Sequence, residues 1–493
     1  MELLDKILDV LKYNPAEPMI FSSGTFLMLF LGFAFVYMML EKKFNARILF
    51  VTLFSYYFYY KSSGLYFFLL AVVTVSDFYI AKLISENRDN KTYSKRLMIL
   101  SLLIDLGLLG YFKYTNFLAG AICQMFGHNF QPWDIFLPVG ISFFTFQSMS
   151  YTIDVYRGQL KPLNKLMDYA FYVSFFPQLV AGPIVRARDF IPQIRKPIVV
   201  TKTMFAEGVY LILIGLFKKA VISDYISLNF IDRIFENPSL YSGVEILLGL
   251  YGYTIQLYCD FSGYSDMAIG IALLLGFHFP QNFNAPLKSV SVADFWRRWH
   301  ISLSSWIRDY IYFSLGGSRK GKFMTYVNLF IAMVLCGIWH GANFNYVFFG
   351  ILQGIAMVVH RYYRLEILHH DKHYESKGWK RIGGILVTMH FFCLSWILFR
   401  NTSFDDTFTM LNQLFTSFHP ELLFDVLAGY KYVFMLVAFG FVTHYLPSSV
   451  HNKCVEVMKR GGVLFNAILL VIVIFIVIQV KSSGIQPFIY FQF

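Results

Sequence analysis

The sequence predicts an all-α protein that crosses a membrane many times, and three observations support this. Hydrophobic residues make up 57% of the chain, whereas roughly 45–50% is usual for a soluble domain. Charged residues make up only 15%, against about 25% in soluble domains, so a soluble fold could not cover its own surface. The apolar runs are long, which favours helices over the short alternating strands of a membrane barrel.

A helix needs about 20 apolar residues to cross the hydrocarbon core. Because several candidate segments are shorter than this, we expect roughly 10–12 crossings, with the remaining segments re-entrant or merged. Residues 168–183 are the clearest re-entrant candidate, because basic residues flank them on both sides and Pro177, Gly182 and Pro183 would break a helix. The candidate spans are residues 19–40, 47–60, 64–82, 97–112, 135–153, 204–223, 241–258, 263–277, 324–340, 344–360, 383–399, 430–447 and 463–480.

The net charge of +12 is spread over short loops. This favours the positive-inside pattern of a multi-pass membrane protein over nucleic-acid binding. Basic loops after the first span and at 453–460 predict that both termini are extracytoplasmic. The five cysteines are scattered, and the histidine-rich run at 369–373 lies in a mixed-charge loop, so we expect no disulfide framework and no bound metal. No linker or repeat divides the chain, which is expected to form one domain, 1–493.

His340 stands near the middle of residues 323–360, a stretch without any Asp, Glu, Lys or Arg. An ionisable side chain at membrane depth is costly and usually faces an interior cavity. A neutral histidine that only joins two helices by hydrogen bonds remains an alternative. The functional interpretation is a general base, because an imidazole has an unperturbed pKa of about 6.5 and burial keeps it neutral.

Residues 294–310 concentrate tryptophan, arginine and a second histidine, His300. If this segment is one helix, one face holds Trp296, His300, Ser304 and Ile307. The arginines Arg297, Arg298 and Arg308 then lie largely elsewhere. One interpretation is an interfacial helix with snorkelling arginines. The other is a cytoplasmic mouth whose guanidinium groups bind the phosphates of a polyanionic donor.

Four blocks in chain order resemble the membrane-bound O-acyltransferase (MBOAT) family, in particular its bacterial branch for O-acetylation of cell-envelope polysaccharides such as alginate. They are PVGISFFTFQSMSYTIDVYRG (138–158), FFPQLVAGPIVR (175–186), the block 258–310 with FWRRWH, and GIWHGANFNYVFFG (337–350). The resemblance implies a ring of helices around a tunnel through a thinned bilayer. It also implies that His340 is the catalytic base and His300 a second functional residue.

The chain ends in PFIYFQF, and an aromatic membrane anchor is the simplest interpretation of residues 488–493. The ending also resembles the C-terminal motif of short partner proteins in teichoic-acid D-alanylation, in which a tyrosine carries the acyl group as an ester. That resemblance implies that Tyr490, in the extracytoplasmic tail 481–493, is an acyl carrier. A phenol can act as a nucleophile once a base removes its proton.

The sequence therefore predicts an O-acyltransferase with no bound cofactor. We expect the donor, acetyl-CoA or another acyl thioester or acyl carrier, to bind near Arg297, Arg298 and Trp339. The acyl group would pass to an extracytoplasmic polysaccharide. We expect a second, SGNH-hydrolase-like acyltransferase as a partner in this step, and contact of the protein with membrane lipid. A lipid or protein acyltransferase with a long-chain donor is the alternative within the class. A polytopic transporter is the alternative outside it, although the sequence has no inverted repeat.

Overall fold

A computed structural model describes residues 10–15, 18–371, 374–480 and 488. Within these ranges the chain forms helices and short connections and contains no β-strand, so the predicted all-α class is confirmed. Polar side chains start several helices: Ser23 accepts a hydrogen bond from the Phe26 N–H and Ser291 from the Asp294 N–H. Such capping satisfies backbone donors that a helix leaves free at its first turn.

The chain divides into two compact units. The first combines Met1–Val209 with Met267–Pro280, and the second combines Tyr210–Asp266 with Gln281–Phe491. Each unit is described by itself below. That residues 1–493 act as one enzyme domain stays a prediction.

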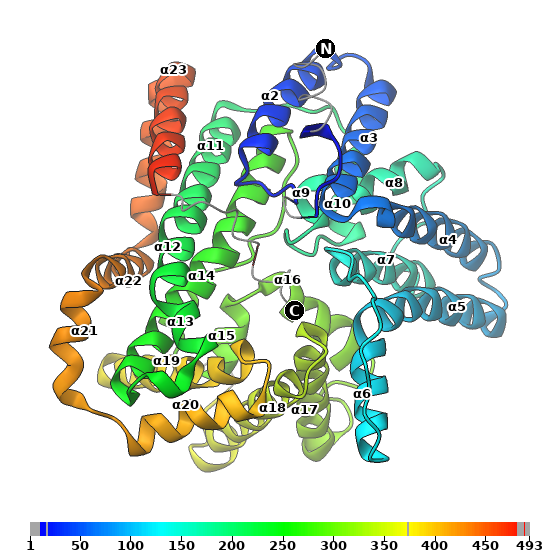
Figure 1. Ribbon diagram of the computed structural model, residues 1–493. Coiled ribbons are helices and arrows are strands. Elements are labelled where there is room, and N and C mark those ends of the chain that lie inside the picture. The colour runs from blue at the N-terminus through cyan, green and yellow to red at the C-terminus, as the bar shows by residue number, and fades with distance from the viewer. Residues whose placement is uncertain (1–9, 16–17, 372–373, 481–487, 489–493) are drawn as a thin grey trace. The chain divides into compact units, whose positions relative to one another are not determined.

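The first unit is organised around α7, whose residues 141–155 are all buried. Helices α4, α5 and α7 pack against one another, and α3 packs against α8 and α9 (Figure 1). Polar groups join the three central helices, because the Ser101 hydroxyl lies 2.6 Å from the Asp77 carboxyl and 3.2 Å from the Thr152 hydroxyl. The helices are α2 (Gly24–Met39), α3 (Phe44–Ser63), α4 (Phe67–Glu86), α5 (Lys91–Leu109), α6 (Thr115–Met125), α7 (Ile141–Tyr156), α8 (Leu166–Ser174), α9 (Phe176–Leu179) and α10 (Ala187–Ile194).

The predicted break within residues 168–183 is confirmed. Helix α8 ends at Ser174, α9 lasts only four residues, and the chain then runs irregularly to α10. A Cβ atom on Gly182 would lie 2.4 Å from the carbonyl oxygen of Pro177, so this turn needs glycine. Residues 171–183 are all buried in protein, where an irregular backbone at membrane depth is tolerated.

Among the remaining helices, the long helix α14 merges two of the candidate spans. Candidate spans 241–258 and 263–277 form one continuous helix and not two, since no Pro interrupts the run and helical hydrogen bonds continue through it. These helices are α11 (Lys202–Leu216), α12 (Asp224–Ile226), α13 (Asp232–Glu236), α14 (Gly243–Leu274), α15 (Val292–Arg298), α16 (Ile301–Trp306), α17 (Gly321–His340), α18 (Phe344–Tyr362), α19 (Gly378–Arg400), α20 (Phe404–Thr416), α21 (Leu423–Gly429), α22 (Lys431–His444) and α23 (Ser448–Val480).

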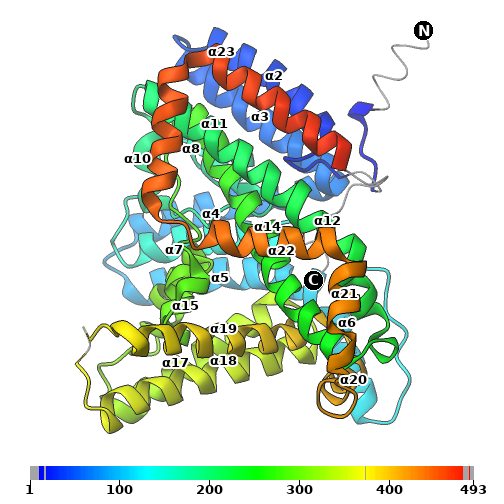
Figure 2. The ribbon, with the colours of Figure 1, turned by 90° about the vertical axis from the view of Figure 1, so that its left-hand side faces the viewer.

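Helices α17 and α18 form a tight antiparallel hairpin, and α19 packs along α18 (Figure 2). Glycines allow the close approach of the hairpin: a Cβ atom on Gly337 would lie 2.6 Å from the Cα of Gly350. Small residues at a helix interface let backbones approach closely inside a membrane. The hairpin thereby fixes the end of α17, where His340 lies.

We expect Gly337→Ala to destabilise the protein, because its new methyl group would collide with the backbone of α18. Overpacking of this kind typically costs about 1–3 kcal/mol. Gly383→Ala is the matched control, since Gly383 lies inside α19 and a Cβ atom added to it would meet no atom within 4 Å. Thermal unfolding in detergent should show a lower midpoint for Gly337→Ala alone. Equal midpoints for both variants would contradict the packing argument.

Five helical segments in the described part of the chain are long and apolar enough to cross a membrane, and a bent pair, Pro420–Gly429 with Lys431–His444, would make a sixth. Several other predicted spans form shorter or interrupted helices, such as α7 and α11. The protein is thus a multi-pass helical membrane protein in which some apolar segments are too short to cross as straight helices.

Candidate functional site

His340 is the last residue of α17, and its side chain is 2% exposed. Its imidazole packs edge-on against Phe399 of α19, with 5.1 Å between ring centroids. The sharp turn that follows is anchored, because Asn345 at the start of α18 donates to the backbone carbonyls of Asn401 and Ser403. The predicted base is therefore buried and held by three helices of the second unit.

The segment 294–310 is not one helix, so the prediction of a single face for Trp296, His300 and Ser304 is wrong. Helix α15 ends at Arg298, α16 begins at Ile301, and His300 between them has φ 43° and ψ 55°. This left-handed conformation costs roughly 1–3 kcal/mol for a residue other than glycine and is concentrated at functional sites. A helical pattern in the sequence does not reveal such a break.

The break buries His300 completely. Its ring lies edge-on to Phe261 of α14, with centroids 4.7 Å apart. Its Nδ1 lies 3.2 Å from Oδ1 of Asn282. Burial, and then the nearby His340, lower the pKa of His300 well below its usual range, so His300 is neutral at physiological pH. A neutral imidazole can accept a proton.

Trp339 contacts both histidines. Its ring centroid lies 6.0 Å from that of His300 and 5.1 Å from that of His340. The structure thus brings together three residues that the sequence singled out, from two segments 40 positions apart. Trp339 is 4% exposed and belongs to the histidine cluster, whereas its predicted role in donor binding stays a prediction.

A cavity of about 550 Å³ opens beside this cluster in the second unit. Arginines and apolar residues form its wall, which also contains Cys336, whose Sγ lies 4.0 Å from Nε2 of His340. The cavity therefore reaches within one helical turn of the buried histidine. The basic residues that line it are Arg297, Arg308, His360, Arg361 and Arg364.

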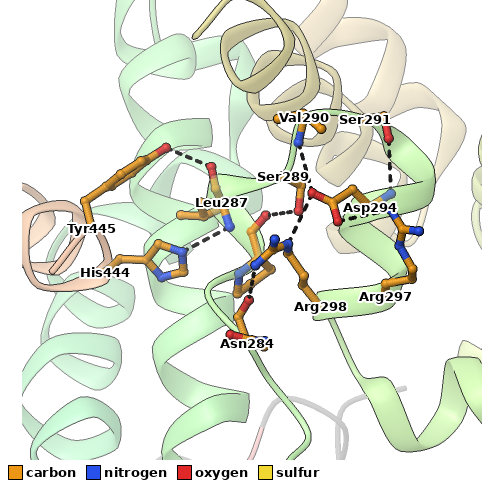
Figure 3. Close-up of polar contacts among 11 residues, drawn as sticks. Asn284, Leu287, Ser289, Val290, Ser291, Asp294, Arg297, Arg298, His444 and Tyr445 are labelled. Atoms are coloured by element: carbon orange, nitrogen blue, oxygen red, sulfur yellow. Dashed lines mark hydrogen bonds and ion pairs between the residues drawn. The ribbon is translucent and has the colours of Figure 1, made fainter. Parts of the chain in front are cut away.

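Arg297 and Arg298 differ in their surroundings. Both contact the Asp294 carboxylate, at 3.3 and 3.2 Å (Figure 3). Arg298 also donates to the backbone carbonyl of Asn284 and is 28% exposed. Its guanidinium therefore links the loop before α15 to this helix. Arg297 is 70% exposed and lines the cavity, which leaves it able to turn toward a ligand.

The loop before α15 is fastened on its other side as well. His444 of α22 accepts a hydrogen bond from the Leu287 N–H, and Tyr445 donates to the Leu287 carbonyl (Figure 3). Asp294 accepts from the Val290 N–H at the other end of this loop. These contacts hold residues 284–290 against α15 and α22.

Tyr490, the predicted acyl carrier, lies outside the described residues. Phe488 in the same tail is described and is fully buried. Its ring contacts Tyr264 and Phe261, at 4.9 and 5.5 Å between centroids. Phe261 is the residue that packs against His300. The tail is therefore anchored next to the histidine cluster at this one position.

Several residues of this region escaped the sequence interpretation. Arg361 and Arg364 stand just past the uncharged stretch, one turn apart on α18 and its continuation, and that spacing was the available signal. Asn282 gave no signal, because its contact with His300 depends on a turn 18 residues away. Within the described residues, no group of three His, Cys, Asp or Glu side chains is arranged to hold a metal ion.

Taken together, buried imidazoles beside a cavity lined by arginines can remove a proton from a hydroxyl and bind a polyanionic reactant. These features, in a polytopic helical protein, fit a membrane-bound group-transfer enzyme. The model of the membrane-bound O-acyltransferase family matches residues 155–398. The chain belongs to this family and is an O-acyltransferase.

Three relatives show how far the likeness extends. A probable alginate O-acetylase of Pseudomonas putida is 36% identical, over 96% of this chain and the full length of the relative. The peptidoglycan O-acetyltransferase of Helicobacter pylori is 34% identical over 80% of each chain. A teichoic acid D-alanyltransferase of Bacillus subtilis is 31% identical over 55% of this chain and 71% of the relative.

Proposed function

We propose that this enzyme transfers an acetyl group from a cytosolic thioester across the inner membrane for O-acetylation of an extracytoplasmic polysaccharide. The observation that carries the proposal is the cavity lined by arginines and by Cys336, which lies one helical turn from His340. The named activities of the alginate and peptidoglycan relatives support an acetyl group and a glycan acceptor. The acceptor itself can be reached through a second, extracytoplasmic acyltransferase.

In this mechanism the arginines bind the phosphates of acetyl-CoA and the thioester reaches the histidine cluster. His340 removes the proton of an attacking hydroxyl, whose oxygen forms a new bond to the thioester carbonyl carbon. The carbon–sulfur bond then breaks, and the proton passes to the departing thiolate, so that free CoA remains in the cytosol. The charged donor never crosses the bilayer, where burying its phosphates would be very costly.

The attacking hydroxyl is that of Tyr490 in our proposal. One residue, Ile489, separates it from Phe488. The two residue steps between them span roughly 7 Å at most when extended. Since Phe488 packs on the ring that contacts His300, the covalent chain permits Tyr490 to reach the cluster. Acyl-Tyr490 would then donate to the extracytoplasmic step. Mass spectrometry of the C-terminal peptide after incubation with acetyl-CoA should find one added acetyl group.

A variant of the cavity tests where the donor binds. We expect Arg361→Ala to raise KM for acetyl-CoA about tenfold, or about 1.4 kcal/mol, through loss of one charge-assisted contact to phosphate. Acetyl-N-acetylcysteamine is a thioester without phosphates, so its KM should not change. Arg381→Ala, at an exposed position of α19, is the control.

The KM values for acetyl-CoA and for acetyl-N-acetylcysteamine are both measured from the release of free thiol by the purified protein. An unchanged KM for acetyl-CoA in Arg361→Ala would show that the donor does not bind in this cavity. A strong preference for a long-chain acyl-CoA over acetyl-CoA in the same assay would instead support a lipid or protein acyltransferase.

A further inference from the structure

The side chain of Asn282 contacts the turn at His300 at several points. Oδ1 of Asn282 lies 3.2 Å from the Ser302 backbone nitrogen, 2.9 Å from the Ser302 hydroxyl and 3.2 Å from Nδ1 of His300. The backbone carbonyl of Asn282 also accepts from the Ile301 N–H, at 2.9 Å. Asn282 thus binds all three residues that follow Trp299, including the histidine in its left-handed conformation.

These contacts determine which ring nitrogen of His300 carries the proton. The backbone N–H of Ser302 can only donate, so the side-chain atom of Asn282 that faces it must be the carbonyl oxygen. An oxygen that accepts from Ser302 requires a donor on the histidine as well, because two acceptors would repel each other. His300 therefore has its proton on Nδ1 and its lone pair on Nε2.

Asn282 is itself rigidly placed. Its side-chain amide donates to the Ser265 hydroxyl on α14, at 3.1 Å, and its side chain is 1% exposed. The backbone of the same segment pairs with the end of α15, since the Asn284 N–H donates to the Arg298 carbonyl. Arg298 returns a hydrogen bond to the Asn284 carbonyl (Figure 3). The loop and the broken helix therefore hold each other in register.

We propose that Asn282 is a positioning residue of the acyl transfer, which fixes the ring orientation of His300 and keeps its basic nitrogen at Nε2. This inference rests on the proposed role of His300 in the reaction. Partners that orient a functional histidine through its second nitrogen are a recurrent device, and their loss typically costs about 10–100-fold where the histidine binds a metal. Asn282 contacts His300 in the same way, through the Nδ1 nitrogen of the ring.

Two substitutions separate orientation from folding. Asn282→Leu keeps the approximate volume and removes the acceptor, so kcat should fall about 10–100-fold while KM for acetyl-CoA changes less than twofold. Asn282→Asp keeps an acceptor for Nδ1–H and should retain more activity. Its carboxylate would favour the protonated ring and raise the pKa of His300, so the acid limb of the pH–rate profile should move to higher pH.

Asn284→Asp is the matched control, since it adds the same charge two residues away at an exposed side chain. It should leave the pH profile unchanged. Because His340 also lowers the pKa of His300, the pH profile of each variant is compared with that of His340→Gln. Thiol release from acetyl-CoA is measured across pH with thermal unfolding of each purified variant. A purely structural Asn282 would lower the unfolding midpoint and leave the profile in place, which would overturn the inference.

A double variant shows whether Asn282 acts through His300. If it does, Asn282→Leu with His300→Ala should be no slower than His300→Ala alone. Multiplicative losses would show that Asn282 acts elsewhere and would overturn the inference. If His300→Ala keeps full activity while His340→Gln loses it, the role proposed for His300 fails and that of His340 stands. If His300→Ala is inactive and Asn282→Leu is fully active, only the present inference fails.

Discussion

His340→Gln is expected to reduce acyl transfer by about three orders of magnitude, or about 4 kcal/mol of transition-state stabilisation. Glutamine fills much of the space of the imidazole and keeps hydrogen-bonding capacity, but it has no nitrogen that accepts a proton near neutral pH. His340 is buried against Phe399 and Trp339, so no water-exposed base can replace it directly. Acetyl transfer by the purified variant, and the ester content of envelope polysaccharide in cells, measure the loss.

The control for this variant is His419→Ala. His419 is exposed, is not part of a helix, and contacts the carboxylate of Glu421. The His419→Ala variant should transfer acyl groups at the wild-type rate. A His340→Gln protein that folds normally and transfers acetyl groups at the wild-type rate would show that His340 is a structural histidine between helices. That result would refute the proposed mechanism while leaving the enzyme class intact.

Tyr490→Phe is expected to reduce polysaccharide O-acetylation to the background level, because the substitution removes only the oxygen that would carry the acyl group. Phenylalanine keeps the aromatic character of the tail, so the anchoring of Phe488 against Tyr264 should persist. Loss of acetylation can then be assigned to the hydroxyl and not to the position of the tail. The measurement pairs ester content of the polysaccharide with mass spectrometry of the C-terminal peptide.

Tyr432→Phe is the control for hydroxyl removal, since Tyr432 is 60% exposed on α22. The Tyr432→Phe variant should acetylate polysaccharide to the wild-type level. Full acetylation by Tyr490→Phe would exclude Tyr490 as the carrier. The acyl group would then pass directly from the thioester to an acceptor, and the arginine cavity and His340 would keep their proposed roles.

The parts of the site that the sequence predicted are those with a short-range signal. His340 was found because an ionisable residue in a long uncharged stretch is costly in lipid. Cavity residues such as Arg361 were missed because their role depends on the way in which α15, α17 and α18 pack. The prediction failed at residues 294–310 because amphipathic spacing fits a continuous helix, whereas contacts with Asn282 stabilise a left-handed turn at His300.

The sequence by itself determined that this is a helical membrane protein of the O-acyltransferase family with two histidines of interest. Composition determines whether a chain can fold in water or in lipid, and a local motif can be recognised without knowing the three-dimensional structure. The tertiary structure alone decided that Trp339 contacts His300, that a cavity lined by arginines reaches Cys336, and that Phe488 lies against Phe261. These are contacts between segments far apart in the chain, and only close packing of helices around small residues and helix breaks brings such segments together.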